Sequence, residues 1–401
     1  MKTTEHKLAD LLITLENGGR PAGGVASITN GVPSVGGEHL TADGGFDFSK
    51  VKYVPEEYFQ NMRRGHIQTD DILIVKDGAT TGKISFVTRD FPFKKAAVNE
   101  HVFILRVNKD KVLSKFLFYN LFSPPGQKQI LANYRGAAIG GINQSFTQNT
   151  IVPIPPLPEQ ERIVRLLDEA ESLRATRERA NARMEQFVPA LFQEMFDDFK
   201  EMTTLGNLVE EFRYGTSNKS NPNGYPTLRI PNVIGQKIDL DDLKYVPVND
   251  EEFKRIQLNE GDILFVRSNG NPDNIGRSAV FESSLILEAG YEPEKFIYAS
   301  YLIRARLKKE LINPHYLQMY LSTNDGRKEA RKRARTSAGQ YNINTENLST
   351  IPVLLPPLTL QREFAARVGE ARGVQSAQGK SAEKIEALYQ SMLSRAFAGE
   401  L

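Results

Sequence analysis

Residues 154–173 read IPPLPEQERIVRLLDEAESL, and residues 354–374 read LLPPLTLQREFAARVGEARGV. In both stretches a proline pair is followed by a leucine and, three residues later, by a glutamine, Gln160 or Gln361. Proline fixes φ and lacks a backbone N–H, so such a run cannot continue a helix or a central strand and is typical of a stiff joint. Apolar residues at helical spacing follow each joint, which predicts two proline-led helices.

Other segments repeat in the same order. The string KYVP at 52–55 recurs at 244–247, and the string DIL at 71–73 recurs at 262–264. Leu8 and Leu11 likewise match Leu205 and Leu208. The separations differ by a few residues only and are far longer than the ~20–50 residues of a solenoid repeat. We infer the duplication of a whole domain-plus-helix unit. The predicted parts are a first globular domain (1–153), a joint with a central helix (154–199), a second domain (200–352) and a joint with a C-terminal helix (353–401).

The composition is that of an ordinary globular protein, with 401 residues, of which 40% are hydrophobic and 25% charged. The absence of cysteine excludes a disulfide framework, a thiolate metal site and a cysteine nucleophile. The five histidines form no local ligand pair. No run is apolar enough for a signal peptide or a membrane span, so we expect a cytoplasmic protein without membrane contact.

Short β-rich runs alternate irregularly with helical stretches in both halves. In the first half these runs are 71–76, 84–88 and 101–107, followed by a helix from Ser114. The second half repeats the order with 262–267, 277–281, 300–305 and a helix from Ile312. Strands mixed with helices and without regular βαβ alternation favour an α+β fold over a doubly wound sheet.

The long helices carry apolar residues at alternating spacings of three and four, which is typical of a coiled-coil seam. The first helix is predicted from Glu159 to Val188, with Pro189 kinking or ending it. The second is expected to be weaker, because Gly369, Gly373 and Gly379 each cost about 1 kcal/mol relative to alanine; these small residues would suit close approach of another helix. The seam is predicted to consist of Ile163, Leu166, Ala170, Leu173, Met184, Phe187, Leu191, Phe364, Val368, Val374, Ile385, Leu388 and Met392.

The charge distribution says more than the net charge of +2. Residues 111–150 hold four basic residues and no carboxylate, and GRKEARKRAR at 326–335 surrounds Glu329 with six basic residues. A charge run is often just a solvated helix face, and that interpretation stays open. Both stretches precede a proline joint at similar distances, which favours a shared role in binding an anionic polymer.

The segment GATTGK at 78–83 follows a predicted strand and imitates a phosphate-binding loop. A P-loop needs G-x-x-x-x-G-K and then Ser or Thr, whereas these glycines are one residue too close and Ile84 replaces the hydroxyl. A hairpin loop that touches polymer phosphates, or a plain hairpin turn, fits better. G-x-S-x-G, HExxH and the Asn/Asp-Pro-Pro-aromatic signature of amino-methyltransferases are absent as well. The sequence therefore predicts a non-catalytic protein.

Taken together, IPPLPEQERIVRLLDEAESL, LLPPLTLQREF, Gly261-Asp262-Ile263-Leu264 with its variant Asp70-Asp71-Ile72-Leu73, the loop 78–83 and the closing SMLSRAFAGEL resemble the specificity (S) subunit of type I restriction–modification enzymes over essentially the whole chain. The resemblance implies two target recognition domains, each reading half of a split, asymmetric DNA site. It also implies an antiparallel helical spacer that docks two methyltransferase (M) subunits, with restriction/translocase (R) subunits joining them. Thr359-Leu360 replaces Pro158-Glu159 in the second copy, so the two joints need not grip partners alike.

No cofactor is expected on this chain; S-adenosylmethionine and ATP are expected on the partner subunits. Loop position and charge select candidate contacts to double-stranded DNA. They are Lys76, Thr80, Thr81, Lys83, Arg135, Asn143, Gln144, Arg267, Asn269, Asn271, Arg277, Arg327, Lys328, Arg331, Lys332, Arg335 and Tyr341. Two alternatives remain at this point: a coiled-coil scaffold that binds protein partners, and a nucleotide-binding enzyme that uses Gly78–Lys83.

Overall fold

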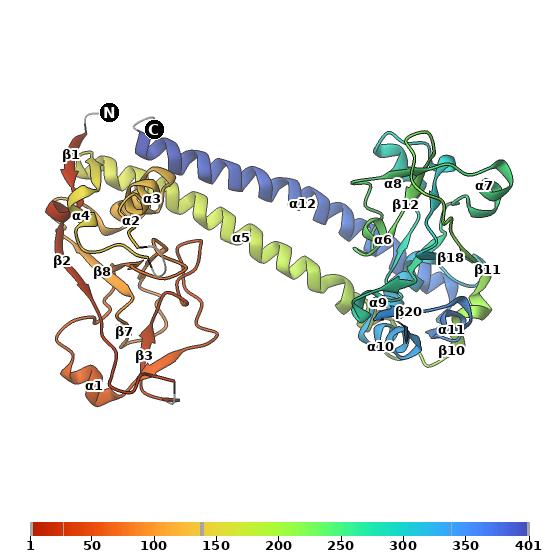
Figure 1. Ribbon diagram of the computed structural model, residues 1–401, viewed down its shortest axis with the longest axis horizontal. Helices are drawn as coiled ribbons and strands as arrows, with labels where there is room; N and C mark the ends of the chain where they lie inside the picture. Colours follow the sequence, from red (N-terminus) through yellow and green to blue (C-terminus); the bar gives the residue numbers. More distant parts are fainter. Residues whose placement is uncertain (1–2, 27, 137–139, 338, 399–401) are drawn as a thin grey trace. The chain divides into compact units, whose positions relative to one another are not determined.

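The computed structural model describes residues 3–26, 28–136, 140–337 and 339–398. The chain forms two compact units (Figure 1). Unit 1 comprises 1–179 and 379–401, and unit 2 comprises 180–378. Helices α5 (Leu157–Phe196) and α12 (Leu358–Ala398) each contribute residues to both units. The predicted boundaries separate each globular domain from the long helix that follows it. The two units are instead defined by contacts between residues, so each unit includes parts of both long helices. The last three residues of the closing motif, 399–401, lie outside the described ranges.

Unit 1 places a four-stranded sheet next to a three-stranded one. The orders are β2-β8-β5-β6 and β4-β3-β7, with a separate pair β1-β9. Before α5, the elements of unit 1 are β1 (Thr4–Lys7), η1 (Leu8–Leu11), β2 (Leu12–Asn17), β3 (Val32–Val35), β4 (Lys52–Val54), α1 (Glu56–Asn61), β5 (Ile72–Val75), β6 (Ile84–Phe86), β7 (Ala97–Val98), β8 (Val102–Val107), α2 (Ser114–Phe122), α3 (Pro124–Leu131), α4 (Phe146–Asn149) and β9 (Ile151–Ile154).

Unit 2 repeats this plan with β11-β18-β14-β16, β13-β12-β17 and the pair β10-β21, and adds the small sheet β15-β20-β19. Its elements between the long helices are β10 (Met202–Thr204), η2 (Leu205–Leu208), β11 (Val209–Tyr214), β12 (Tyr225–Leu228), α6 (Ile230–Val233), β13 (Lys244–Val246), α7 (Asp250–Ile256), β14 (Ile263–Val266), β15 (Ser268–Asn269), η3 (Pro272–Asn274), β16 (Ser278–Val280), α8 (Ser283–Glu288), η4 (Pro293–Lys295), β17 (Ile297–Tyr298), β18 (Leu302–Leu307), α9 (Pro314–Ser322), α10 (Asn324–Arg333), β19 (Arg335–Ser337), β20 (Gln340–Asn342), α11 (Thr345–Ser349) and β21 (Pro352–Leu354).

The predicted α+β class and the repeated strand order are confirmed. The central strands β5 and β14 are buried along their whole length, which explains why they read as continuous apolar runs and not as alternating ones. Even an irregularity is duplicated: the register shifts near the start of β2 against β8, and at the same place in β11 against β18. Duplication therefore extends to backbone detail.

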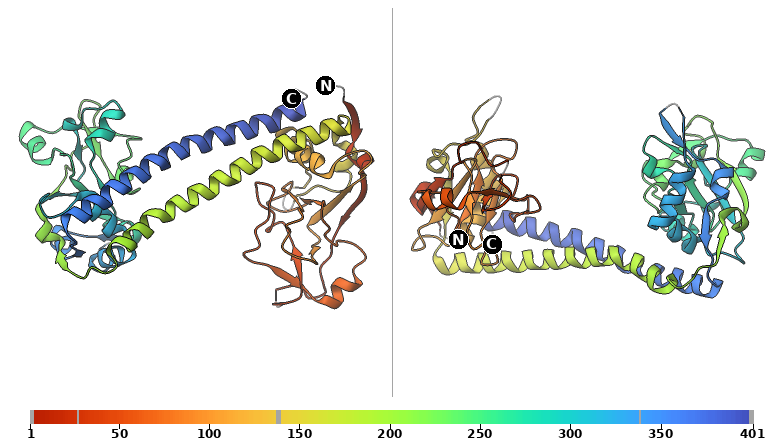
Figure 2. Two further views of the ribbon diagram at one scale, coloured as in Figure 1. Left: turned by 180° about the vertical axis from the view of Figure 1, so that it is seen from behind. Right: turned by 90° about the horizontal axis from the view of Figure 1, so that it is seen from below.

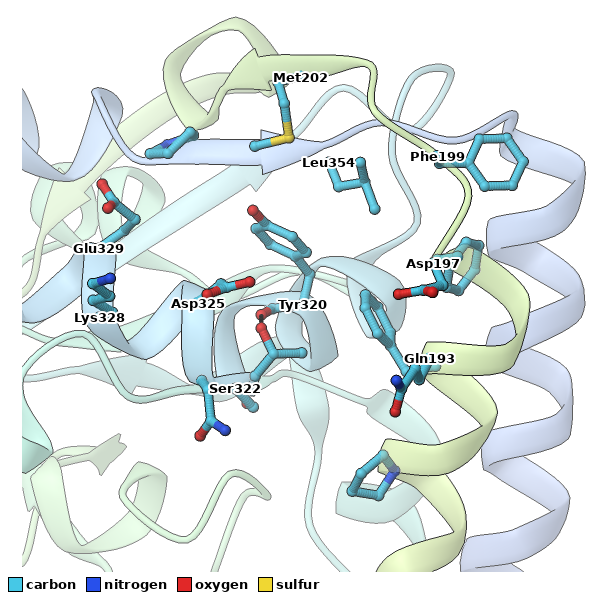
Figure 3. A pocket seen from close by; sticks show the side chains of 16 residues that line it. Gln193, Asp197, Phe199, Met202, Tyr320, Ser322, Asp325, Lys328, Glu329 and Leu354 are labelled. Carbon is cyan, nitrogen blue, oxygen red and sulfur yellow. Dashed lines mark hydrogen bonds between the residues drawn. The ribbon is translucent and has the colours of Figure 1, made fainter.

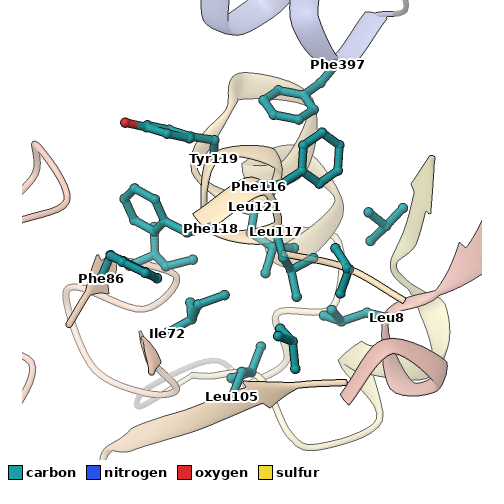
Figure 4. Packing of buried hydrophobic residues seen from close by; sticks show 14 of the residues in the cluster. Leu8, Ile72, Phe86, Leu105, Phe116, Leu117, Phe118, Tyr119, Leu121 and Phe397 are labelled. Atoms are coloured by element: carbon teal, nitrogen blue, oxygen red, sulfur yellow. The ribbon is translucent and has the colours of Figure 1, made fainter. Parts of the chain in front are cut away.

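In unit 1 the core joins the sheet to helices from both ends of the chain (Figure 4). Ile72 and Leu105 from the strands meet Leu117 of α2, while Phe397 of α12 lies edge-on to Phe116 at 5.4 Å. In unit 2 the corresponding place is taken by α5, where Phe196 contacts Tyr316 and Phe364. Each unit thus buries the first turns of one long helix and the last turns of the other (Figures 1 and 2).

The sequence predicts that Pro189 either kinks the first helix or ends it at Val188, and the second of these predictions is wrong. Helix α5 continues to Phe196 with Pro189 inside it. A proline inside a helix removes one hydrogen bond and costs about 3 kcal/mol. The turns that follow bury Leu191 and Phe196 in the core of unit 2, and this apolar burial offsets the loss.

The predicted seam has the correct heptad period, but its intermediate positions are displaced by one residue. Ile163, Ala170, Leu191, Phe364 and Val368 are buried as predicted, and Leu166, Met184, Ile385 and Met392 are half-buried. The remaining four predicted positions are wrong, because their side chains are exposed: Leu173 58%, Phe187 43%, Val374 48% and Leu388 54%.

The side chains that turn inward instead are each one residue away. Leu167 and Tyr389 are buried, and Arg174, Val188 and Gln375 are half-buried. In two of these pairs the prediction took the apolar residue, Leu173 or Val374, whereas the polar neighbour, Arg174 or Gln375, turns inward in the middle of the seam. A long cation can bury its stem and keep its head group solvated, so Arg174 takes an inward place, where it lies 5.2 Å from the Tyr389 ring and 3.4 Å from Glu386.

The expectation that the glycines of α12 admit a closely approaching helix is also wrong. A Cβ built on Gly369, Gly373 or Gly379 would meet nothing within 4 Å in the described part of the chain. The helix nevertheless spans Leu358–Ala398, because its two ends are packed into the cores of the two units. Tertiary packing therefore outweighs its weak intrinsic propensity.

Candidate nucleic-acid interface

In unit 1 the loop 76–83 lies beside residues 134–136 and 140–144. The N–H of Gly78 donates to the carbonyl of Gly140 at 3.2 Å, and the N–H of Ile142 donates to the carbonyl of Lys76 at 2.7 Å. These bonds bring together predicted DNA contacts from two separate parts of the sequence. The members of this group are Lys76, Thr80, Thr81, Lys83, Arg135, Asn143 and Gln144.

The loop 76–83 is a hairpin connection and not a P-loop. It joins β5 to the antiparallel β6, and no helix follows it as phosphate binding by a P-loop would require. Thr81 is half-buried and its hydroxyl donates to the carbonyl of Gly78 at 2.7 Å, so it shapes the turn. Thr80 is exposed, and Lys83 is half-buried. The structure thus favours the hairpin among the alternatives for GATTGK.

In unit 2 the equivalent loop is extended by a small sheet. Strand β15 pairs with β20, which places Asn269 opposite Tyr341, and β20 pairs with β19, which places Arg335 opposite Asn342. The guanidinium of Arg267 lies 4.6 Å from the Tyr214 ring centroid and donates to the carbonyl of Ser300 at 3.1 Å. Arg267, Asn269, Arg335 and Tyr341 therefore share one surface, as predicted contacts should.

Three arginines surround the turn that follows. Arg277 and Arg327 both donate to the carbonyl of Asp273, at 3.0 and 2.8 Å, and Arg331 pairs with its carboxylate at 2.7 Å. Arg327 also donates to the carbonyl of Ile275 at 2.8 Å. Burial and the charges of Arg277 and Arg331 lower the pKa of Arg327 to about 10, so it remains a cation at neutral pH.

This geometry changes the roles of several predicted contacts. Arg327 is half-buried, and its bonds to the backbone of the 269–276 loop hold that loop in place. It therefore acts as a brace for the loop and is not a free phosphate ligand. The side-chain oxygen of Asn269 accepts from the N–H of Asn271 at 2.9 Å, and that of Asn271 accepts from the N–H of Asp273 at 2.9 Å. Both asparagines use their side-chain carbonyl groups to shape the turn, so the predicted contacts to base edges fall to their NH₂ groups.

Lys328 is separated from the other basic residues of α10. It lines a cavity of about 970 Å³ together with Phe192, Phe196, Tyr320 and Met202, near the end of α5 (Figure 3). Asp197, Asp325 and Glu329 also line this cavity, and such an acidic, aromatic lining is unsuited to DNA phosphate. Lys332 is exposed and lies 3.4 Å from Glu329. The predicted basic cluster is therefore divided between two surfaces.

The sequence reasoning did not identify the charged group beside the first hairpin. His101 Nδ1 lies 2.5 Å from Asp77, its Nε2 lies 3.3 Å from Glu100, and Arg20 lies 3.2 Å from the same Glu100 oxygen. Tyr214 and the exposed Tyr301 of unit 2 were missed as well. The alignment of the two copies offered a signal for His101 and Tyr301, which occupy equivalent positions before β8 and β18.

Each unit also contains a buried ion pair, at equivalent positions in the two copies. Asp71 accepts from Arg106 at 2.7 and 3.0 Å, and Asp262 accepts from Arg306 at 3.1 and 2.9 Å. Burial, the largest influence, raises the pKa of Asp71 despite its arginine partner. The aspartate of the repeated DIL string is thus a structural residue at the start of the strand that leads into the hairpin loop.

Comparison with known proteins identifies these paired units. A family model described as "Type I restriction modification DNA specificity domain" matches residues 16–186 and again 198–369. The chain belongs to this family.

Relatives match along most of the length. The chain is 26% identical over 385 residues to the type I restriction enzyme EcoKI specificity subunit of Escherichia coli (strain K12), covering 90% of this chain and 80% of that protein. It is 24% identical over 384 residues to the StySPI specificity subunit of Salmonella potsdam, with the same coverage. By family this is a DNA specificity subunit of the type I restriction–modification class.

Solved structures support the fold. A chain from a study of assembly and conformational transition of the type I R-M system aligns with a TM-score of 0.59 at 16% identity, covering 100% of this chain and 98% of that one. The S subunit from M. genitalium aligns with a TM-score of 0.58 at 14% identity, covering 99% and 96%. Within the described residues, no helix is long and apolar enough to cross a membrane, and no acidic or histidine cluster could hold a metal ion.

Proposed function

We propose that this chain is the non-catalytic, sequence-reading subunit of a type I restriction–modification complex, and that each unit reads one half of a bipartite, asymmetric DNA site. The observation that carries the proposal is the duplication: two family domains, each with a hairpin loop beside a second polar segment. The two surfaces carry different side chains, whereas the strand orders of the units that support them are the same. Such a pair is suited to reading two different short sequences.

The two surfaces combine the chemistry that DNA recognition requires. Exposed cations such as Arg135, Arg335 and Lys332 contact phosphates and supply affinity. Amide and hydroxyl groups of Gln144, Thr80 and Asn269 reach base edges and supply sequence choice. The methyl transfer and cleavage steps belong to partner subunits, two M subunits and R subunits. We expect S-adenosylmethionine and ATP to bind to those partners.

A domain exchange tests the proposal. The full chain is co-expressed with its methyltransferase partner, and the methylated sequence is mapped on genomic DNA. Replacing residues 1–153 with the matching domain of a family member should change one half of the recognised site and leave the other half as it was. A change in both halves, or in neither, would contradict the assignment of one half-site to each unit.

The distance between the half-sites should follow the helices. Because α5 and α12 both contribute to each unit, four residues are inserted into both, within 171–183 and 375–384. Four residues add about 6 Å of helix, and one base pair occupies about 3.4 Å, so the gap should grow by one or two base pairs. Methylation mapping measures the gap, and an unchanged gap would refute the link between helix length and spacing.

A further inference from the structure

The first turn of each long helix carries a glutamine that is completely buried. Gln160 is the fourth residue of α5 and Gln361 the fourth of α12, and both are 0% exposed. The side-chain oxygen of Gln160 accepts from the N–H of Leu113 at 2.9 Å, and its NH₂ group donates to the carbonyls of Pro155 at 2.9 Å and Lys111 at 3.3 Å.

Gln361 makes the same bonds in unit 2. Its oxygen accepts from the N–H of Asn313 at 2.8 Å, and its NH₂ group donates to the carbonyls of Pro356 at 2.7 Å and Leu311 at 3.3 Å. The two residues before each glutamine differ, Pro158-Glu159 in one copy and Thr359-Leu360 in the other, yet the three bonds are reproduced. The repetition indicates a joint that both copies need.

Each glutamine ties together three segments that are separate in sequence. Leu113 and Asn313 are the residues that cap the N-termini of α2 and α9, and the prolines form the joint before the long helix. An amide is well suited to this place, since it accepts with one end and donates with the other. Removing it would leave a buried N–H and two carbonyls without partners, which is costly in an apolar interior.

We propose that Gln160 and Gln361 are positioning residues that fix the direction in which each long helix leaves its domain, and thereby set how strictly the protein measures the gap between two half-sites. The inference rests on the proposed function. Prolines restrict the chain before each helix, and the glutamine removes the remaining freedom of its first turn.

A small angle at this joint has a large effect at the other end of the helix. Helix α5 contains 40 residues. At 1.5 Å per residue that is about 60 Å, so a tilt of roughly 3° at the first turn displaces the last turn by about 3.4 Å, the rise of one base pair. The three hydrogen bonds of each buried glutamine therefore lie at the start of the helix, where a change of direction has its largest effect on spacing.

The test uses the full chain in complex with its co-expressed methyltransferase partner. Gln160→Met and Gln361→Met keep the side-chain volume and remove the hydrogen bonds. Gln186→Met, at an exposed position of α5, is the matched control. Affinity is measured for duplexes whose two half-sites are separated by the natural gap or by one base pair more or fewer, and for duplexes that hold one half-site alone.

We expect the preference for the natural gap over its neighbours to fall by about tenfold in each glutamine variant, the factor that one or two lost hydrogen bonds represent. Affinity for a single half-site and the control variant should be unchanged. Equal weakening on every duplex, the single half-site included, would show a merely structural residue and overturn the inference, as would an unaltered gap preference.

A second substitution covers the case in which a methionine variant does not fold. Gln160→Glu and Gln361→Glu retain the acceptor for the backbone N–H and lose the two donated bonds, so a smaller relaxation of gap preference is expected. If the glutamate variants fold and keep the full preference, the inference is wrong. If the unaltered complex shows no preference for paired half-sites at all, the proposed function fails instead, which separates the two ideas.

Discussion

The junction between domain and long helix is built twice in this chain, with the same joint and opposite electrostatics. In unit 1, Lys115 of α2 lies 2.8 Å from Asp168 of α5, and the hydroxyl of Tyr119 donates to Asp168 and to Glu171 at 2.6 and 2.8 Å. Burial and these carboxylates raise the pKa of Tyr119. Every charged group in this junction has a partner of opposite sign or a hydrogen bond.

At the equivalent positions of unit 2 stand His315, Gly369 and Arg372. They line a cavity of about 370 Å³ that is shared with Lys237 and Glu282. Arg372 donates to Gln318 at a long 3.5 Å, and burial lowers its pKa. Among the described residues this guanidinium has no carboxylate within ion-pair distance. Both copies keep the buried glutamine. The helix face beside it carries Asp168 and Glu171 in unit 1, whereas in unit 2 the same face carries Arg372 and borders a cavity.

The difference shows which features duplication retains. Backbone-directed bonds, such as those of Gln160 and Gln361, depend on the frame and are kept. Side-chain pairs at the rim can be replaced together, since a surface ion pair contributes little to stability. The two units can therefore diverge in what they contact without losing the geometry that relates each domain to its helix.

The largest effect should come from breaking the buried ion pairs that both units share. Removal of one partner of such a pair costs about 3–5 kcal/mol, because the other charge stays buried. Asp262→Ala should be more damaging than Asp71→Ala, because it takes the carboxylate partner from Arg306 and also leaves Arg304, which is 1% exposed, with Glu211 as its remaining carboxylate.

Hydrogen exchange checks this prediction unit by unit. Amides of β14 should lose more protection in Asp262→Ala than amides of β5 lose in Asp71→Ala. An equal loss in both would mean that the second arginine adds nothing. The control is Asp70→Asn, which removes the charge of an aspartate that is 43% exposed beside Lys109. Little change is expected, because asparagine tolerates the positive φ of 72° at this position.

A smaller effect is expected from making the 269–276 loop of unit 2 resemble the hairpin loop of unit 1. Arg327 braces the 269–276 loop, and Gln127 occupies the equivalent position in unit 1. Arg327→Gln should lower discrimination between the specific site and unrelated DNA by about tenfold, within the ~1–3 kcal/mol of a base-reading contact.

Lys332→Gln is the comparison, because Lys332 is 69% exposed and is one of the proposed phosphate contacts. It should weaken binding to all sequences alike and reduce the salt slope by about one. Titration at several salt concentrations separates the two behaviours. If Arg327→Gln also acted equally on all sequences, the brace would be an ordinary phosphate ligand.

The smallest effect concerns acidity at the hollow junction. Burial lowers the pKa of His315, with Arg372 acting in the same direction and Glu282 and Glu260 opposing it. In the unfolded chain His315 has its ordinary pKa of 6.5, whereas in the folded chain its pKa is lower. Below pH 6.5 the unfolded chain therefore binds a proton that the folded chain does not, so unit 2 should lose stability as the pH falls through 6.5.

His315→Gln should remove this part of the pH dependence. The difference in melting temperature between the two proteins is measured from pH 7.5 to pH 5, where other groups contribute equally to both. A constant difference over this range would contradict the role of His315. Unit 1 has Lys115 at this position, paired with Asp168, so no matching transition is expected there.

Much of the fold could be predicted because it is written in local pattern and in repetition. Strands such as β5 and β14 were identifiable from continuous apolar runs, and the proline joints marked where both long helices begin. The predicted DNA-facing residues of the two hairpin loops do gather on one surface in each unit. What they contact in DNA stays a prediction.

Several outcomes depended on partners that are distant in sequence. Arg327 and Lys332 belong to one basic run, yet one holds the carbonyls of Asp273 and Ile275 and the other faces solvent. Charge alone could not separate them, because the separation is made by a loop some fifty residues earlier in the chain. Charge alone could not place Lys328 either, because it lines a cavity whose aromatic residues include Phe192 and Phe196 at the end of α5.

The sequence by itself determined the duplicated α+β plan, the two joints and the heptad period, since strand length, proline chemistry and apolar spacing are local properties. Only the tertiary structure decided which member of each neighbouring pair, Leu173 or Arg174, Leu388 or Tyr389, turns inward. It also carried α5 through Pro189. The physical reason is that a helical pattern specifies a period, whereas burial against a particular neighbour selects the face and outweighs a local cost of a few kcal/mol.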